Sequence, residues 1–211
     1  MKFVAKGIAA IVAVVTLLVP SAFAATTPTL NQNINPGTLS MNIMQSDGTT
    51  PVDSPTVAFS EVNRNFACQT ATATLGDTNN KIYVSNLANN GGFSLTMAAT
   101  GGAAATWTDS GKTYKYNDPA SAGCANGQMT VNPSDGTVTL DCSSSCTSDN
   151  VTRGASTSFA SGTADSVTLM TRANGSGWRG YLTGVSLSQT IPANQASGTY
   201  ALGMTMTLTA Q

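Results

Sequence analysis

The sequence predicts an all-β protein: a single antiparallel β-sandwich, of Greek-key or jelly-roll type, with one irregular segment pinned by disulfides. Apolar and polar residues alternate with a period of two in about a dozen short segments, which is the pattern of half-buried strands. Clusters of Gly, Pro, Asn and Asp separate these segments at the spacing typical of a sandwich. No amphipathic helical stretch of useful length interrupts the series, and no repeat of fixed length indicates a solenoid.

The first residues have the organisation of a secretory signal peptide. Lys2 and Lys6 give it a positive start, residues 7–19 form an apolar run too short to span a bilayer comfortably, and residues 22–24, Ala-Phe-Ala, are a small-x-small cleavage site. Residues 1–24 are therefore expected to be removed, leaving a mature chain without a membrane span. This predicts an exported protein, secreted or displayed at the extracellular cell surface.

The mature chain carries few charges. Seven basic residues face ten acidic ones once Lys2 and Lys6 are removed, so its formal net charge is −3, compared with −1 for the full sequence. Such a sparse, slightly acidic set forms no basic stripe, which argues against nucleic acid as a partner. Residues 25–36 are polar and are expected to form a flexible lead-in. Residues 37–211 are then expected to form the single sandwich domain.

The expected strands follow the alternation in chain order. They lie at residues 39–43, 57–59, 66–68, 82–84, 93–99, 105–107, 112–116, 129–131, 138–140, 167–170, 181–191 and 199–210. The segment 117–157 is the least regular and holds three of the four cysteines.

Three turn sequences predict reversals between neighbouring strands. They are Asn89-Asn90-Gly91-Gly92, Asp109-Ser110-Gly111 and Pro133-Ser134-Asp135-Gly136. In the hairpin around the third turn, Val131 would face Val138, and Met129 would face Leu140. Both pairs join apolar side chains, which supports this register.

The last strand, residues 199–210, shows the alternation most clearly. Its apolar positions are Tyr200, Leu202, Met204, Met206, Leu208 and Ala210, and threonine fills most of the positions between them. We expect this strand to be an integral part of the core, with Thr205 and Thr207 on its other face. Because the strands carry Thr and Ser rather than Lys, their edges lack charged groups that prevent strand addition. Copies could therefore pair edge to edge, with residues 25–36 as a donated strand.

The four cysteines predict two disulfides, because an even number in an exported protein indicates a disulfide framework. The register of the third hairpin places Cys124 opposite Ser145, the residue before Cys146. This favours a Cys124–Cys146 disulfide and leaves Cys68 to pair with Cys142. The alternative is a small Cys142–Cys146 loop with Cys68 joined to Cys124. A zinc site is disfavoured, since the chain has no histidine to complete the usual ligand sets.

The sequence argues against an enzyme. Histidine is absent and Glu61 is the only glutamate, so neither a Ser/His/Asp nor a Cys/His arrangement can form. Asp109-Ser110-Gly111 echoes the aspartic protease motif, but it occurs once and a β-turn explains it fully. No cofactor is expected. Calcium is the one candidate ion, with oxygen ligands from Asn117, Asp118, Asp135, Asp141 and Asp149.

Aromatic residues offer a candidate platform for a sugar. They are Trp107, Trp178, Tyr114, Tyr116 and Tyr181. The competing interpretation is that these rings are buried in the sandwich, where Trp and Tyr are common.

The C-terminus resembles the closing hairpin of small exported bacterial surface proteins. The resemblance rests on Gly184 to Gln195, on Gly198-Thr199-Tyr200 and on the Thr-rich last strand. WxL-type cell-wall domains and pilin-like or coat-type β-sandwiches end in a similar way. The WxL motif itself is absent, because the segments beginning at Trp107 and Trp178 lack leucine two positions later. Binding to peptidoglycan through that motif is therefore not implied.

This resemblance implies a surface-exposed structural or adhesive role. Together with the residues, it predicts a non-enzymatic secreted or cell-surface structural protein of the bacterial envelope that self-associates through strand edges. The alternative is a carbohydrate-binding adhesin or lectin-like module with a cell-wall or surface glycan as its partner.

Overall fold

The computed structural model describes residue 32 and residues 37–87, 91–119, 125–142, 150–175 and 177–211. The chain divides into two units, Met1–Ile34 and Asn35–Gln211, and every described strand belongs to the second. The described residues are all-β, with antiparallel pairing throughout and only short 3-10 turns besides. Within the described residues, there is no helix with the length and apolar character needed to cross a membrane.

Twelve of the described strands form three sheets of four, which we name after a central strand of each. The β12 sheet has the order β1 (Leu39–Met44), β3 (Lys81–Asn86), β12 (Trp178–Thr183) and β8 (Thr137–Leu140). The β13 sheet has the order β10 (Thr157–Ser158), β7 (Met129–Asn132), β13 (Val185–Ile191) and β2 (Gln69–Leu75). The β4 sheet has the order β14 (Met204–Ala210), β4 (Phe93–Ala99), β11 (Ser166–Arg172) and β9 (Val151–Arg153). A separate hairpin joins β5 (Thr106–Asp109) to β6 (Lys112–Lys115).

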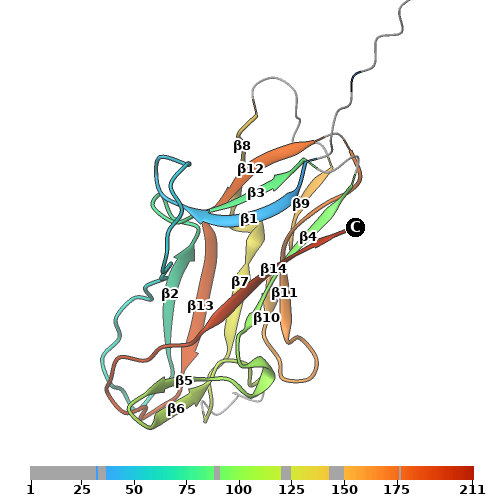
Figure 1. The fold of residues 1–211 in the computed structure, drawn as a ribbon. Helices are drawn as coiled ribbons and strands as arrows, with labels where there is room; N and C mark the ends of the chain where they lie inside the picture. The colour runs from blue at the N-terminus through green and yellow to red at the C-terminus, as the bar shows by residue number, and fades with distance from the viewer. Residues whose placement is uncertain (1–31, 33–36, 88–90, 120–124, 143–149, 176) are drawn as a thin grey trace, which may run out of the picture. The chain divides into compact units, whose positions relative to one another are not determined.

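The β12 and β13 sheets are built from three long strands that are each interrupted at the same level (Figure 1). β13 continues β12 beyond Gly184, and its partners β2 and β7 likewise continue into β3 and β8, the partners of β12. Two glycines shape this level. Gly76 and Gly184 both have φ of +77°, a conformation that glycine adopts without steric cost. The Gly184 N–H donates to the Gly76 carbonyl over 2.8 Å, so the two interruptions are held together.

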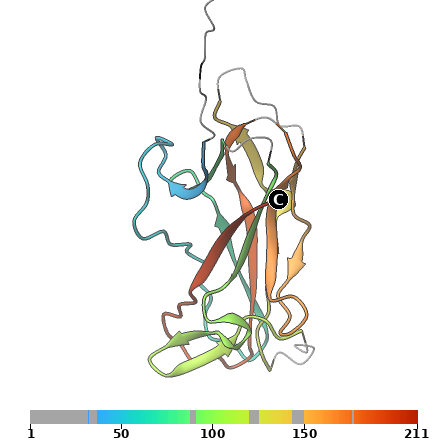
Figure 2. The same cartoon turned by 45° about the vertical axis from the view of Figure 1, so that its right-hand side comes forward.

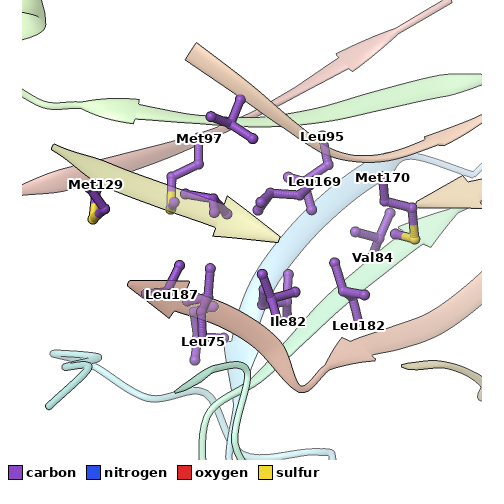
Figure 3. Close-up of a cluster of buried hydrophobic side chains, with 14 of the residues drawn as sticks. Leu75, Ile82, Val84, Leu95, Met97, Met129, Leu169, Met170, Leu182 and Leu187 are labelled. Atoms are coloured by element: carbon purple, nitrogen blue, oxygen red, sulfur yellow. The ribbon is translucent and has the colours of Figure 1, made fainter. Parts of the chain in front are cut away.

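The hydrophobic core lies between the β4 sheet and the β12 and β13 sheets. Figure 3 shows Leu95 and Leu169 on one side of the cluster and Ile82, Leu182 and Leu187 on the other. The first four of these side chains are completely buried. Because a fully buried leucine stabilises a fold by about 1.5–3 kcal/mol, contacts between these layers are the main stabilising feature.

The predicted hairpin around Pro133–Gly136 is wrong. Pro133–Asp135 form a 3-10 turn, labelled η3, that interrupts a long strand without reversing it. Consequently Val131 lies opposite Leu187 and Val138 lies opposite Leu182, and the two valines do not face each other. The predicted hairpin around Asn89–Gly92 is wrong as well, because β3 and β4 belong to different sheets.

The predicted turn at Asp109-Ser110-Gly111 is confirmed. β5 and β6 pair from Asp109–Lys112 outward. Ser110 has φ of +46° and Gly111 has φ of +87°, so both central residues adopt the positive φ of a two-residue I′ hairpin turn. Residues 57–59 and 66–68, which were predicted to be strands, are irregular in the structure. Val57 and Phe59 still pack against the core, which is the source of their alternation.

The last strand is an edge strand, and its apolar side chains pack against the core as expected, although they are half-buried rather than buried. β14 pairs with β4 alone among the described strands, and Figures 1 and 2 both show it at the outside of its sheet. Its predicted faces are confirmed: Met204, Met206 and Leu208 are half-buried, while Thr205 and Thr207 are exposed. Residues 199–203 are not part of the strand, but Ala201 forms an isolated bridge to Thr108.

Candidate functional site

The structure divides the predicted aromatic residues between the core and the surface. Trp178 and Tyr116 are completely buried, so the prediction that they bind a sugar is wrong. The Trp178 ring lies 5.5 Å from that of Phe93 in the core. Tyr116 packs edge-on against Phe159 and donates a hydrogen bond to the Gly102 carbonyl over 3.3 Å. The alternation of each segment separates its side chains onto two faces, but it does not show which face meets the core. Trp178 and Tyr116 lie on the faces that do.

Two of the predicted residues, Trp107 and Tyr114, do meet in a pocket. They lie opposite each other on β5 and β6, with nearly parallel rings whose centroids are 6.0 Å apart. Phe59 meets Trp107 edge-on at 5.4 Å, and Tyr200 meets Tyr114 edge-on at 5.1 Å. These four residues line a cavity of about 770 Å³, which we call the aromatic pocket. Tyr181 lies outside it, paired with Tyr83 on the β12 sheet.

Hydrogen bonds to buried or backbone groups fix the aromatic rings. The Trp107 indole N–H donates to Gln189 Oε1 over 2.9 Å, and Gln189 is 1% exposed. The Gln189 amide in turn donates to the Thr190 carbonyl over 2.8 Å. Tyr200 donates to the Ala196 carbonyl over 2.8 Å and accepts from Gln195 over 2.7 Å. The surface of the pocket is therefore preorganised, which lowers the entropic cost of binding a ligand.

The hairpin that carries Trp107 and Tyr114 is tied to the segment before β14. Thr108 and Ala201 exchange two backbone hydrogen bonds of 3.0 Å. Lys112 donates to the Ser197 carbonyl over 2.6 Å and pairs with Asp109 at 3.4 Å. Since residues from both segments line the pocket, these contacts hold two of its walls at a fixed spacing.

Tyr114 stays uncharged at neutral pH. Burial raises the pKa of its hydroxyl above the ordinary value, and the neighbouring Tyr200 hydroxyl raises that pKa further. The pocket therefore presents neutral aromatic surface.

Residues 61–65 supply polar groups to the rim of the pocket. Glu61, Asn63 and Arg64 line it and are exposed. Neither Glu61 nor Arg64 forms an ion pair with a described residue. The rim thus offers one carboxylate, one guanidinium and an amide, with no net charge.

Sequence reasoning missed Phe59 and Tyr200 as members of this pocket. Phe59 lies in a segment that the alternation assigned to a strand, and Tyr200 was assigned to the apolar face of the last strand. The Gly-x-Tyr sequence at residues 198–200 was the available signal for Tyr200, because a tyrosine after a turn often holds a loop by its hydroxyl.

The predicted calcium ligands do not come together, so that prediction is wrong for the described residues. Asp118 receives a hydrogen bond from Asn126 and pairs with Lys115, whereas Asp141 pairs with Arg179 beyond the far end of β8. Asp135 lies between them in η3, and the buried Asn117 donates its amide to the Ala103 carbonyl. Asp149 lies outside the described residues. Among the described residues, no three His, Cys, Asp or Glu side chains gather as a metal site would require.

The cysteine pairing that the sequence favoured does not fit the structure. Cys68 precedes Gln69, which pairs with Ile191 at the end of β13, whereas Cys142 Sγ lies 3.3 Å from the Arg179 carbonyl near the start of β12. A disulfide needs Cα atoms within about 7 Å, and the intervening length of β12 and β13 is several times that. Cys124 and Cys146 lie outside the described residues. The alternative connectivity, Cys142–Cys146 with Cys68–Cys124, stays a prediction.

A second hollow lies over the outer face of the β13 sheet. Its volume is about 890 Å³, and hydroxyl side chains of three strands line it: Thr72, Thr74, Thr130, Ser186 and Ser188. Asp77 and Asp135 also line it. The surface is therefore polar, with two carboxylates and no basic side chain among the residues that line it.

No family model, curated protein or solved structure matches this chain. The fold and the surface therefore define a class rather than a family: an all-β protein with an aromatic pocket and a long, uncharged edge strand.

Proposed function

We propose that this chain is an exported, non-enzymatic structural protein of the bacterial surface that associates with further copies of itself through the open edge of β14. The observation that carries this proposal is the edge itself. β14 is seven residues long, contains neither a charge nor a proline, and hydrogen-bonds to another described strand on one side only. Natural edge strands of this length usually carry a lysine, a proline or a bulge that prevents strand addition.

The layered arrangement of the sheets supports this proposal. Two layers packed around one core form a β-sandwich, an open architecture that retains edges. The opposite edge of the β4 sheet is β9, which has three residues and ends in Arg153. That edge is short and charged, so it accepts a further strand less readily. Of the two edges of the β4 sheet, β14 is therefore the one that accepts a further strand more readily.

Export also belongs to the proposal. Signal-peptide cleavage after Ala24 would leave residues 25–36 ahead of the domain, and two disulfides would suit an oxidising location. Symmetry then separates two modes of assembly. If β14 pairs with β14 of a second copy, the contact is self-complementary and closes as a dimer. If β14 accepts residues 25–36 of a second copy, the contact is head-to-tail and propagates as a fibre.

The test is sedimentation and electron microscopy of the mature chain, residues 25–211, over a range of concentrations. We expect association by the wild type, and loss of association in Thr207→Lys. Lysine at this central position places like charges beside each other when two β14 edges pair along their full length, and places a charge on the edge in either mode. Thr96→Lys is the matched control, because Thr96 is the partner of Thr207 on the same face of the sheet but lies on the central strand β4.

A third variant that lacks residues 25–36 separates the two modes. Fibres that disappear on this deletion would identify the lead-in as the donated strand, whereas unchanged assembly would exclude it. A wild-type chain that remains monomeric at every concentration would contradict the proposed function. Equal loss of assembly in Thr207→Lys and Thr96→Lys would contradict the role of the edge.

A further inference from the structure

We propose that the aromatic pocket binds a neutral saccharide. The inference is independent of assembly through β14, because it rests on the pocket formed by Phe59, Trp107, Tyr114 and Tyr200. It concerns a second surface with a different ligand.

The first argument is the combination of surfaces within one cavity. A sugar ring has apolar C–H faces and a polar circumference of hydroxyls. The faces of Trp and Tyr provide apolar surface of high electron density, which C–H groups approach favourably. Around these rings, Glu61 provides acceptors, Arg64 provides donors, and Asn63 provides both. The pocket thus matches the two kinds of surface that a sugar presents.

The second argument is charge. Glu61 and Arg64 are the charged residues among those that line the pocket, and their charges cancel. The pKa of Tyr114 is raised by burial, so its phenol adds no charge at neutral pH. Because the two charges cancel, neither an acidic nor a basic sugar gains a net electrostatic advantage, whereas a neutral sugar uses both side chains as hydrogen-bonding groups. The electrostatics therefore favour a neutral saccharide.

Size and rigidity agree with this ligand class. The volume of about 770 Å³ lies within the range of about 300–1,000 Å³ that is usual for small-ligand sites, and it leaves room for more than one sugar ring. Trp107 is held by the buried Gln189, and Tyr200 by the Ala196 carbonyl, so neither ring must be ordered when a ligand binds.

A proline-rich peptide is the other ligand that aromatic-lined grooves commonly take. Such a peptide presents carbonyl acceptors and few donors, so it depends on donors between the rings. Of the three aromatic side chains here that carry a donor, two are already occupied: the Trp107 indole N–H donates to Gln189, and the Tyr200 hydroxyl donates to the Ala196 carbonyl. These observations favour the saccharide.

The two tryptophans of the chain make the test direct. Trp178 is completely buried in the core, so a ligand in the pocket changes the surroundings of Trp107. We would screen the mature protein on an array of neutral oligosaccharides of glucose, galactose, mannose and N-acetylglucosamine, together with uronic-acid oligosaccharides and a decaproline peptide. Each probe that binds would then be titrated while tryptophan fluorescence is recorded, in the wild type and in Trp178→Phe.

We expect a neutral oligosaccharide to bind and to change the fluorescence in both proteins. In Tyr114→Ala the affinity should fall at least about tenfold, since the variant removes one wall of aromatic surface. Tyr83→Ala is the matched control: Tyr83 is also a half-buried tyrosine against another aromatic ring, but it lies on the β12 sheet away from the pocket. Its affinity should equal that of the wild type. Glu61→Gln and Arg64→Gln, both at exposed rim positions, should weaken binding without affecting the fold.

Three results would overturn the inference. One is an array on which no neutral saccharide binds. Another is equal affinity in Tyr114→Ala and the wild type. The third is binding of decaproline or of uronic-acid oligosaccharides, but not of neutral ones, with the same dependence on Tyr114. Circular dichroism of each variant keeps these results separate from a loss of folding.

Discussion

β4 and β14 are neighbouring strands with almost the same sequence pattern and different roles. They pair residue by residue, so Leu95 lies opposite Leu208 and Met97 opposite Met206. The side chains of Leu95 and Met97 are buried, whereas those of Leu208 and Met206 are only half-buried. The difference arises because β4 has a strand on each side and β14 has one. A period of two thus determines which face of a strand is apolar, while the position in the sheet determines how deeply that face is buried.

The largest loss of stability is expected from a substitution on the central strand β4. Leu95→Ala should lower the free energy of unfolding by about 2–5 kcal/mol, because it leaves a cavity in a core that cannot relax fully. Denaturant unfolding of the purified variant measures this change. A loss below about 1 kcal/mol would show that β4 is not central to the core.

The paired position on the edge strand should respond less. Leu208→Ala should cost about 1–2 kcal/mol, because water already reaches the side chain and can fill the space that the truncation leaves. The same unfolding experiment, below the concentration at which copies associate, gives the comparison. Equal losses for Leu208→Ala and Leu95→Ala would mean that β14 is covered on both sides.

Alkaline pH should lower the stability of the fold through Tyr114, which packs against Tyr200 in the segment before β14. The pKa of Tyr114 is raised by burial and by Tyr200, so the folded state favours the neutral phenol. This stabilisation is fully present below the unfolded pKa of about 10 and is lost as the pH rises towards the folded pKa. We therefore expect the melting temperature to fall above about pH 10, and to fall less steeply in Tyr114→Phe. Identical pH profiles for the two proteins would show that Tyr114 is not buried against Tyr200.

The smallest effect should occur on the outer face of the edge strand. Thr207→Ala should change the free energy of unfolding by less than about 0.5 kcal/mol, because the side chain is exposed. Leu208→Ala, one residue further on, is its control. If the two variants shifted the melting temperature equally, the assignment of the two faces would be wrong.

The sequence predicted the class of fold because alternation is a local property. It also predicted the two faces of β14. The turn at Ser110 and Gly111 was predictable as well, because the positive φ angles that it requires depend on these two residues alone. The Pro133–Gly136 turn was misassigned because a proline followed by Ser, Asp and Gly suits both a hairpin and a 3-10 interruption. Only the pairing of β7 and β8 with β13 and β12 decides between them.

Only part of the candidate site could be predicted, because the sequence shows local patterns but not which distant segments meet. Trp107 and Tyr114 were predicted from their aromatic side chains alone, and the pairing of β5 with β6 brings them together. Trp178 and Tyr116 were misassigned because alternation separates two faces of a strand without identifying which of them meets the core. Phe59 and Tyr200 reach the pocket from segments distant in sequence from the β5–β6 hairpin. Their proximity is a tertiary contact for which no local pattern exists.

Amide hydrogen exchange of β14 tests the central claim most directly. In an antiparallel pair, alternate residues point their N–H groups towards the partner strand and the others point away from it. At low concentration, we predict protection of about every second amide of β14, those that face β4, and rapid exchange of the rest. As copies associate, the rapidly exchanging amides should become protected, and Thr207→Lys should prevent this change. Uniform protection of all β14 amides at low concentration, equal to that of β4, would contradict an open edge.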